Sequence, residues 1–166
     1  MALCFLGMGS NVEDRMGYIL KALDHIKNYA KILKSSTVYE SQPWGVEDQP
    51  SFLNSVVMVE TNLRPLDLLY RVKESEMLIG RRDRGRWGPR EIDIDILLYE
   101  DHIIMLSFLK IPHPYILERD FVLIPLLEIA PHLIHPLYKT PLSQYANQIE
   151  ISLKPFACLY GIDSKG

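Results

Sequence analysis

The chain has 166 residues and a formal net charge of −3, with 48% hydrophobic and 23% charged residues. This length and composition predict one globular domain, residues 1–166, that can bury a core without disulfides or structural metals. The slightly acidic balance excludes any general electrostatic attraction to nucleic acid or to an anionic membrane.

The N-terminal part of the chain predicts a strand, a helix and a second strand. Residues 2–8 are apolar and predict a buried strand, after which Ser10 or Asn11 can cap a helix that reaches about residue 29. Residues 32–39 contain several β-branched side chains and predict the second strand. The helix is indicated by apolar residues at three- and four-residue spacing, namely Met16, Ile19, Leu20, Leu23 and Ile26.

The next part predicts a loop, a third strand and a second helix. Residues 40–53 hold two prolines and a glycine among polar residues and predict the loop, whereas residues 54–62 alternate as a strand does. Pro65 suits the first turn of a helix, and Gly80 suits its end. The expected inward-facing residues of this helix are Leu66, Leu69, Val72 and Met77.

A second loop (residues 81–91) and a fourth strand (residues 92–99) complete a β-α-β-β-α-β order. This order predicts an α+β, ferredoxin-like core, with an antiparallel sheet and helices on one of its faces. The C-terminal part is rich in proline and predicts further short helices at 121–129 and 141–148. Residues 151–159 predict a returning strand.

Cysteine use and hydropathy bear on the cellular location. Cys4 and Cys158 lie far apart in the sequence and form no Cys-x-x-Cys pair, which predicts free thiols in a reducing compartment. The apolar N-terminus lacks a preceding basic segment, and no apolar run approaches the ~20 residues of a membrane span. We therefore expect a cytoplasmic protein.

Two aspartates lie on the fourth predicted strand. Because side chains alternate along a strand, Asp93 and Asp95 share one face, about 6–7 Å apart. Their mutual repulsion is relieved by a divalent cation, and oxygen ligands favour magnesium over zinc. A short Asp-x-Asp pattern is also compatible with a solvated strand edge that has no function.

The loop that precedes this strand is basic. It contains five arginines (81, 82, 84, 86 and 90) and only two acidic residues, in a chain that is acidic overall. Arginine forks match phosphate oxygens, and such a loop beside a carboxylate pair suits metal-assisted polyphosphate chemistry. The residues leave open a merely solvated loop, and they leave open which of Arg82 and Arg84 faces phosphate.

Together these residues resemble the 6-hydroxymethyl-7,8-dihydropterin pyrophosphokinases. The main motif is Arg-Trp-Gly-Pro-Arg-x-x-Asp-x-Asp at residues 86–95. Three further motifs follow the expected order along residues 3–131. They are Gly-Ser-Asn at 9–11, Pro-Trp-Gly at 43–45 followed by Asp-Gln-Pro-x-Phe-Leu-Asn at 48–54, and Pro-His at 112–113 followed by Arg-x-Phe at 119–121.

The resemblance implies a catalytic and nucleotide-binding set. Asp93 and Asp95 would hold two Mg²⁺ ions, and Arg86 with Trp87 would close the loop over the filled site. Glu76 matches an acidic position beside the active site. The residues expected to contact ATP or steady its phosphates are Arg81, Arg90, Ile96, His113 and Arg119.

The resemblance also implies a pterin-binding set. Phe52 and Phe121 would sandwich the ring, because a flat heterocycle gains from aromatic faces on both sides. Asn54 would bond the pterin edge, since an amide both donates and accepts. The remaining expected contacts are Asp93 and the residues Ser41, Gln42 and Trp44.

The implied reaction is transfer of pyrophosphate from ATP to the pterin alcohol, with AMP as the leaving group, in folate biosynthesis. The expected protein is a monomer that acts on ATP and the pterin and binds neither nucleic acid nor membrane. Two other classes remain open: an ordinary kinase that transfers the γ-phosphoryl group, and a non-catalytic ferredoxin-like module that binds RNA or a small effector.

Overall fold

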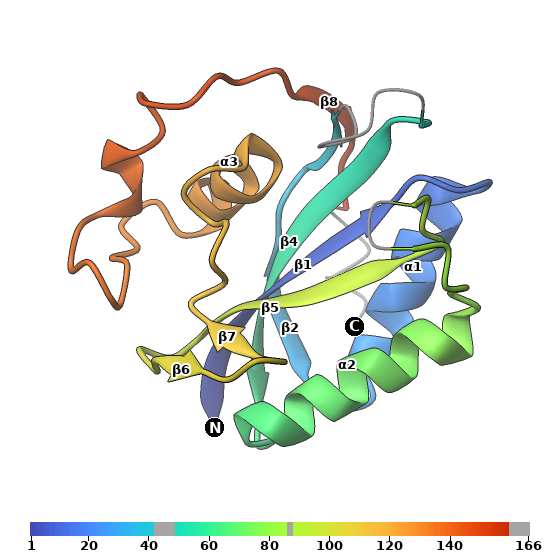
Figure 1. The fold of residues 1–166 in the computed structure, drawn as a ribbon, viewed down its shortest axis with the longest axis horizontal. Coiled ribbons are helices and arrows are strands. Elements are labelled where there is room, and N and C mark those ends of the chain that lie inside the picture. The colour runs from blue at the N-terminus through green and yellow to red at the C-terminus, as the bar shows by residue number, and fades with distance from the viewer. Residues whose placement is uncertain (42–48, 86–87, 160–166) are drawn as a thin grey trace.

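A computed structural model describes residues 1–41, 49–85 and 88–159 (Figure 1). The main sheet has the order β5-β1-β4-β3-β8, with β2 also paired to β4, and its neighbouring strands are antiparallel. The strands are β1 (Ala2–Ser10), β2 (Lys31–Ser35), β3 (Val38–Ser41), β4 (Phe52–Thr61), β5 (Asp93–Tyr99) and β8 (Lys154–Ala157). The expected ferredoxin-like arrangement is confirmed.

Helices cover both faces of this sheet (Figure 1). α1 (Arg15–Ile26) and α2 (Pro65–Ile79) lie together on one face, as expected for the ferredoxin-like core. α3 (Asp120–Ile129) packs on the opposite face, against β4 and β3. The smaller elements are the hairpin of β6 (Ile104–Met105) and β7 (Lys110–Ile111) and a 3₁₀ helix, η1 (Leu142–Gln144).

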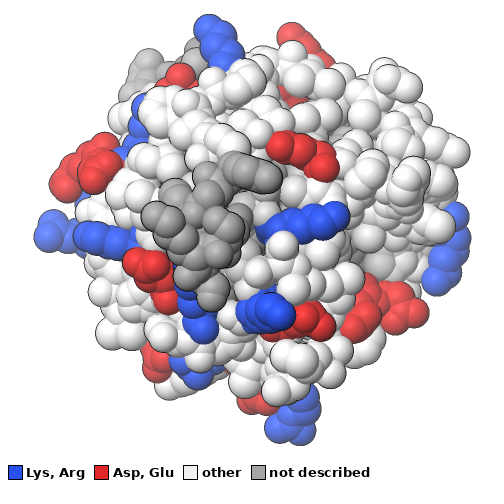
Figure 2. Space-filling view, turned by 180° about the vertical axis from the view of Figure 1, so that it is seen from behind, with Lys and Arg blue, Asp and Glu red and all other residues white. Residues whose placement is uncertain are grey.

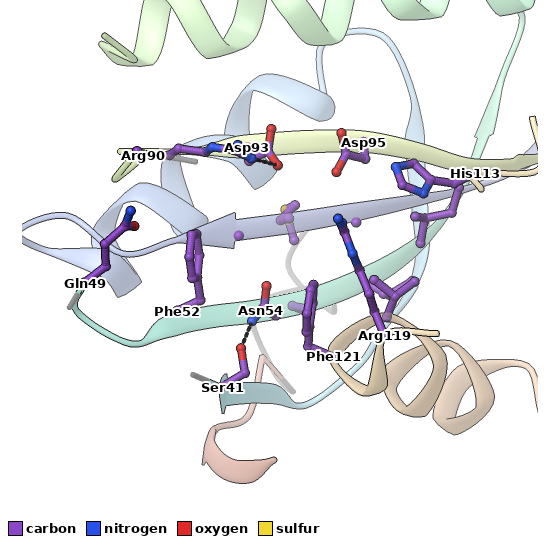
Figure 3. A pocket seen from close by; sticks show the side chains of 18 residues that line it. Ser41, Gln49, Phe52, Asn54, Arg90, Asp93, Asp95, His113, Arg119 and Phe121 are labelled. Atoms are coloured by element: carbon purple, nitrogen blue, oxygen red, sulfur yellow. Dashed lines mark hydrogen bonds and ion pairs between the residues drawn. The ribbon is translucent and has the colours of Figure 1, made fainter. Parts of the chain in front are cut away.

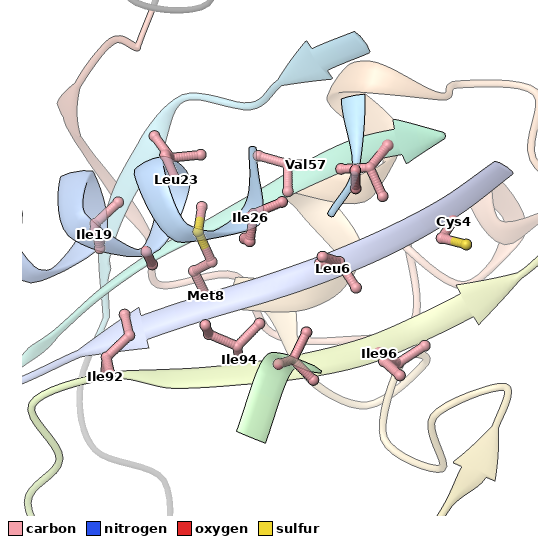
Figure 4. Packing of buried hydrophobic residues seen from close by; sticks show 14 of the residues in the cluster. Cys4, Leu6, Met8, Ile19, Leu23, Ile26, Val57, Ile92, Ile94 and Ile96 are labelled. Atoms are coloured by element: carbon pink, nitrogen blue, oxygen red, sulfur yellow. The ribbon is translucent and has the colours of Figure 1, made fainter. Parts of the chain in front are cut away.

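The alternation of side chains in β1 divides the core into two clusters. Leu6 and Met8 point toward α1 and α2, where they pack with Ile94 of β5 (Figure 4). Phe5 points the other way and packs with Leu123 in the cluster beneath α3. Burial of apolar surface on both faces stabilises this central strand.

The predicted strand at residues 32–39 is two strands in the structure. Ser36 interrupts it, and its buried hydroxyl accepts a hydrogen bond from Val56 N at 2.9 Å and lies 3.1 Å from Ser55 Oγ. Thr37 N donates to the carboxylate of Glu128 on α3. The chain therefore breaks where serine and threonine find side-chain partners in place of ladder bonds.

Two details of the helix predictions are wrong. α1 is capped by Asp14, which accepts a bond from Gly17 N at 3.0 Å, because β1 continues through Ser10. In α2, Leu66 and Met77 are 51% and 75% exposed. The buried stripe of α2 is Leu68, Val72, Ser75, Glu76 and Ile79, because Ser75 and Glu76 find polar partners inside.

The C-terminal part follows the predictions only partly. The helix at 121–129 is confirmed as α3, and the returning strand is confirmed as β8, which pairs with β3. The region 141–148 forms only the short η1. Among the described residues, no helix is both long and apolar enough to span a membrane.

Candidate active site

A pocket that is open to solvent lies on the sheet face that carries α3 (Figure 3). Its floor is β1 at Gly7 and Gly9, between β4 and β5. Asp93 and Asp95 of β5 point into it because Ile94 and Ile96, the alternate residues, are buried in the α1–α2 core. Strand periodicity thus places two carboxylates beside the pocket and two isoleucines beneath the sheet.

The structure brings together many of the residues singled out in the sequence. They come from five parts of the chain: the end of β3, the start of β4, the start of β5, the segment after β7 and the start of α3. The predicted site residues that line the pocket are Ser41, Phe52, Asn54, Arg90, Asp93, Asp95, His113, Arg119 and Phe121.

An aromatic slot forms one side of the pocket. Phe52 and Phe121 stand on either side of Asn54, whose Nδ2 donates to Ser41 Oγ at 2.7 Å (Figure 3). Gly9 opposes Asn54 in the sheet, and a Cβ there would lie 3.0 Å from Asn54 Oδ1 and 3.7 Å from Phe52. The missing side chain leaves room for a flat group over Asn54.

The opposite side of the pocket is charged. Asp93 Oδ1 pairs with Arg81 at 3.1 Å, and Oδ2 pairs with Arg90 at 3.0 Å. Burial alone would raise the pKa of Asp93, but the positive charges of Arg90, Lys73 and Arg81 outweigh it and lower that pKa. Asp93 is therefore a carboxylate at neutral pH, held in place by two guanidinium groups.

Asp95 has a different environment. No hydrogen bond or ion pair joins its side chain to another group within residues 1–41, 49–85 and 88–159. Burial and the charge of Asp93 raise the pKa of Asp95 to about 7. A carboxylate whose charge is unfavourable in the folded protein is suited to receive a cation.

Glu76 supports this side from α2. Its Oε2 accepts a hydrogen bond from Ile94 N at 2.7 Å, and its Oε1 pairs with Arg81 at 2.9 Å. Lys73 lies 3.3 Å from Glu76 and was not singled out in the sequence. Glu76 thus joins α2 to β5 and orients Arg81 toward Asp93.

His113 and Arg119 form the wall between β5 and α3 (Figure 3). His113 N donates to Leu97 O, and its Nδ1 accepts from Tyr115 N at 3.2 Å, so the proton of the neutral ring is on Nε2. Burial and the charge of Arg119 lower the pKa of His113 to about 4. Arg119 stacks over Tyr115, at 4.4 Å from the ring centre.

Arg84 faces away from the pocket and toward Glu91. The two terminal nitrogens of Arg84, Nη1 and Nη2, each lie 2.6 Å from an oxygen of the Glu91 carboxylate, which also accepts from Arg82 N at 3.1 Å. The hydrogen bond from Arg84 lowers the pKa of Glu91 to about 2. We therefore interpret Arg84 as a residue that shapes the loop.

Arg84→Met is expected to lower the Tm by about 2–5 °C at pH 7 and to leave turnover unchanged. The pKa of Glu91 is lower in the folded protein, so the pair stabilises the fold above about pH 4.5 and that contribution is lost as the pH falls to about 2. The difference in Tm between the variant and the wild type should shrink over this range in thermal melts. A large loss of turnover in a folded Arg84→Met would contradict the structural role.

Some predicted residues are not brought together with the pocket. The side chain of Ile96 packs among Cys4 and Leu6 on the other face of the sheet, so a contact with ATP from that side chain is not supported. Arg81 lies behind Asp93 and does not itself line the pocket. Gln42, Trp44, Arg86 and Trp87 lie outside the described residues.

Gln49 at the pocket and Asn11 behind it were given no contact in the sequence predictions. Gln49 lines the pocket, and its side chain accepts a hydrogen bond from Asn11, which is buried at the end of β1. The available signal was the polar Ser10-Asn11 pair that directly follows an apolar strand. This pair predicts a helix cap and, with Gly9, forms one of the family motifs, but neither pattern specifies a contact with Gln49.

The chain is similar to known proteins along most of its length. Residues 5–131 match the family model described as 7,8-dihydro-6-hydroxymethylpterin-pyrophosphokinase (HPPK). The 2-amino-4-hydroxy-6-hydroxymethyldihydropteridine pyrophosphokinase of Aquifex aeolicus is 52% identical over 159 residues, which cover 96% of this chain and 98% of that protein. The protein of the same name from Bacillus subtilis is 41% identical, over 76% of this chain and 77% of that protein.

Some relatives are much longer than this chain. The folic acid synthesis protein FOL1 of Dictyostelium discoideum is 44% identical over 81% of this chain, but the match covers only 20% of that protein. The crystal structure of Plasmodium falciparum HPPK-DHPS superposes with a TM-score of 0.70 at 19% identity. The superposition covers 89% of this chain and 43% of the Plasmodium falciparum chain. At 19% identity, this likeness supports the fold alone.

Proposed function

The chain belongs to the 7,8-dihydro-6-hydroxymethylpterin-pyrophosphokinase family, and we propose that it transfers pyrophosphate from ATP to 6-hydroxymethyl-7,8-dihydropterin in folate biosynthesis. The products are AMP and the pterin diphosphate. The observation that carries the proposal is one pocket with two unlike sides. Phe52, Asn54 and Phe121 suit a flat heterocycle, and Asp93 with the nearby arginines suits a metal–polyphosphate group.

Asp93 and Asp95 are the proposed ligands of Mg²⁺. The described residues contain no group of three or more His, Cys, Asp or Glu side chains that could enclose an ion. Two carboxylates nevertheless fit, because Mg²⁺ is usually bound by one or two carboxylates together with waters and substrate phosphates. When bound, Mg²⁺ neutralises phosphate charge and lowers the pKa of the attacking hydroxyl group.

The protein's own contribution is to align the two substrates. The aromatic slot directs the hydroxymethyl group of the pterin toward β5, and Arg90 and Arg119 neutralise the transferred phosphates. His113 is neutral and can donate from Nε2 to a phosphate oxygen. The alcohol oxygen bonds to the β-phosphorus, the bond from the β-phosphorus to the bridging oxygen of AMP breaks, and the hydroxyl proton leaves to solvent.

The nucleotide product tests this reaction. The protein is mixed with ATP, Mg²⁺ and the reduced pterin alcohol, and the nucleotides are separated by chromatography. AMP should form in equal amount to the pterin diphosphate. Formation of ADP would instead indicate a kinase that transfers the γ-phosphoryl group. The absence of any turnover would contradict the proposed function.

The aromatic slot gives a second test. Phe52→Leu should raise KM for the pterin about 3- to 10-fold, because one stacked face is lost, and should leave KM for ATP unchanged. Phe52→Tyr is the matched control, since its ring retains the face, and its KM should stay near the wild-type value. Equal KM values for all three proteins would show that Phe52 only fills the core.

An RNA-binding ferredoxin-like module is less well supported. Such modules bind RNA on an open sheet face through aromatic residues of adjacent strands. Here α3 covers much of that face, and the two aromatic residues of the slot come from β4 and α3. Among the described residues, the view in Figure 2 shows mixed charges and no broad basic surface.

A further inference from the structure

We propose that Asn11 is a positioning residue that couples the pterin side of the pocket to the phosphate side. Asn11 directly follows the central strand β1 and is 1% exposed. This inference concerns the site proposed above and therefore rests on the proposed function. It assigns to Asn11 no contact with either substrate.

The place of Asn11 follows from the sheet. Gly9 of β1 lies between Asn54 of β4 and Asp93 of β5. Both neighbouring strands are antiparallel to β1, so the segments that lead into β4 and β5 run past its end. A side chain two residues beyond Gly9 can therefore reach both of these segments.

One half of the Asn11 contacts holds the segment before β5. Arg90 N donates to Asn11 Oδ1 at 2.7 Å, and Asn11 N donates to Arg90 O at 3.0 Å. The backbone of Arg90 is thus held at both its donor and its acceptor. The guanidinium of Arg90 in turn pairs with Asp93, so these bonds set the position of the charged side.

The other half holds the segment before β4. Asn11 Nδ2 donates to Pro50 O at 3.2 Å and to Gln49 Oε1 at 3.1 Å. Gln49 lines the pocket, and Pro50 precedes Phe52 by two residues. The segment that leads to Phe52, one of the two aromatic residues of the slot, is therefore held by the same amide that holds Arg90.

A buried amide with partners on both sides is costly to break on one side only. When one ligand orders its segment, the Asn11 side chain becomes ordered with it. The other segment is then already held in place, so binding of the second ligand costs less conformational entropy. The expected result is positive coupling between the nucleotide and the pterin.

Calorimetry measures this coupling directly. The affinity for the pterin alcohol is determined with and without a non-hydrolysable ATP analogue and Mg²⁺. The wild-type protein should bind the pterin about 5- to 150-fold more tightly in the presence of the analogue. In Asn11→Ala this factor should fall below about 2, and kcat should fall about 10- to 100-fold.

Asn11→Asp separates the two halves of the contact. It keeps an oxygen that accepts from Arg90 N, but its second oxygen faces Pro50 O and Gln49 Oε1 without a proton to donate. The affinity for the analogue alone should stay within about twofold of wild type, while the coupling factor is lost. Equal weakening of both ligands with an unchanged coupling factor would contradict the proposal.

Thr61→Val is the matched control for lost stability. Thr61 is also buried, and its hydroxyl donates to Tyr29 O at 2.8 Å and accepts from Leu63 N, but it lies at the far end of β4. This variant should lower the Tm and keep the wild-type coupling factor.

The outcomes distinguish this inference from the proposed function. A wild-type protein that forms AMP but shows no coupling, or an Asn11→Asp that retains it, overturns the role of Asn11 alone. A wild-type protein that neither binds the pterin nor forms AMP overturns the proposed function.

Discussion

Asp95→Asn is expected to reduce kcat by about 10³-fold or more and, at the same time, to stabilise the metal-free protein. The loss of activity follows because the proposed metal site has only two carboxylates, and the charge stabilisation by a bound metal contributes several kcal/mol. The gain in stability follows because burial and the charge of Asp93 disfavour the Asp95 carboxylate in the folded protein. Partial exposure to the pocket limits the gain to about 1 kcal/mol.

The pH dependence of this gain has a defined sign. The pKa of Asp95 is about 7 in the folded protein and near 3.8 ordinarily, so the folded state binds more protons between these values. Wild-type stability attributable to Asp95 therefore falls as the pH rises from about 4 to 7. Urea unfolding in the presence of a chelator measures this dependence. The free energies of unfolding of Asp95→Asn and of the wild type should become equal below about pH 4.

Asp93→Asn is the matched comparison. It should also lose turnover, but it should be less stable than the wild type, because Arg81 and Arg90 lose the carboxylate that pairs with both. The two variants thus agree in activity and differ in the sign of the stability change. A kcat of Asp95→Asn within tenfold of wild type would show that Asp95 does not bind the metal.

Arg119→Met is expected to reduce kcat/KM for ATP by about 10²- to 10³-fold, with little change in KM for the pterin. Arg119 reaches into the pocket from the start of α3, beside Asp95 and His113 (Figure 3). Burial lowers the pKa of Arg119, but an arginine side chain stays charged, so a cation faces the proposed phosphate site in a partly buried setting. Removing one such donor to developing charge costs about 3–4 kcal/mol.

Arg119→Lys tests whether charge alone is sufficient. Lysine keeps the charge but lacks the planar fork and the stacking on Tyr115, so it should recover only part of the lost activity. Steady-state kinetics with each substrate varied in turn provides the measurement. An Arg119→Met that affects only the pterin would instead assign this residue to the aromatic slot.

Local pattern was sufficient for most elements of the fold and for the shared face of the two aspartates on β5. The alternation of Asp93 and Asp95 with isoleucines predicts a shared face without knowledge of the fold, because strand periodicity is a local property. The helix at 121–129 and the β-α-β-β-α-β order were predicted in the same way. The predictions were wrong where polar side chains have partners distant in sequence. Ser36 divides the predicted second strand, and the buried Glu76 places a different face of α2 against the sheet than the predicted one.

The sequence by itself therefore determined the fold class, the family and most residues of the candidate site. Only the tertiary structure decided how the two aspartates of β5 differ. Asp93 is paired with two arginines, whereas Asp95 is paired with none of the described residues, although the two lie only two positions apart. It also decided that Arg84 faces Glu91 and that Asn11 joins the segments before β4 and β5. The reason is that charge environment and hydrogen-bond partners depend on residues brought together by folding, which spacing along the chain does not specify.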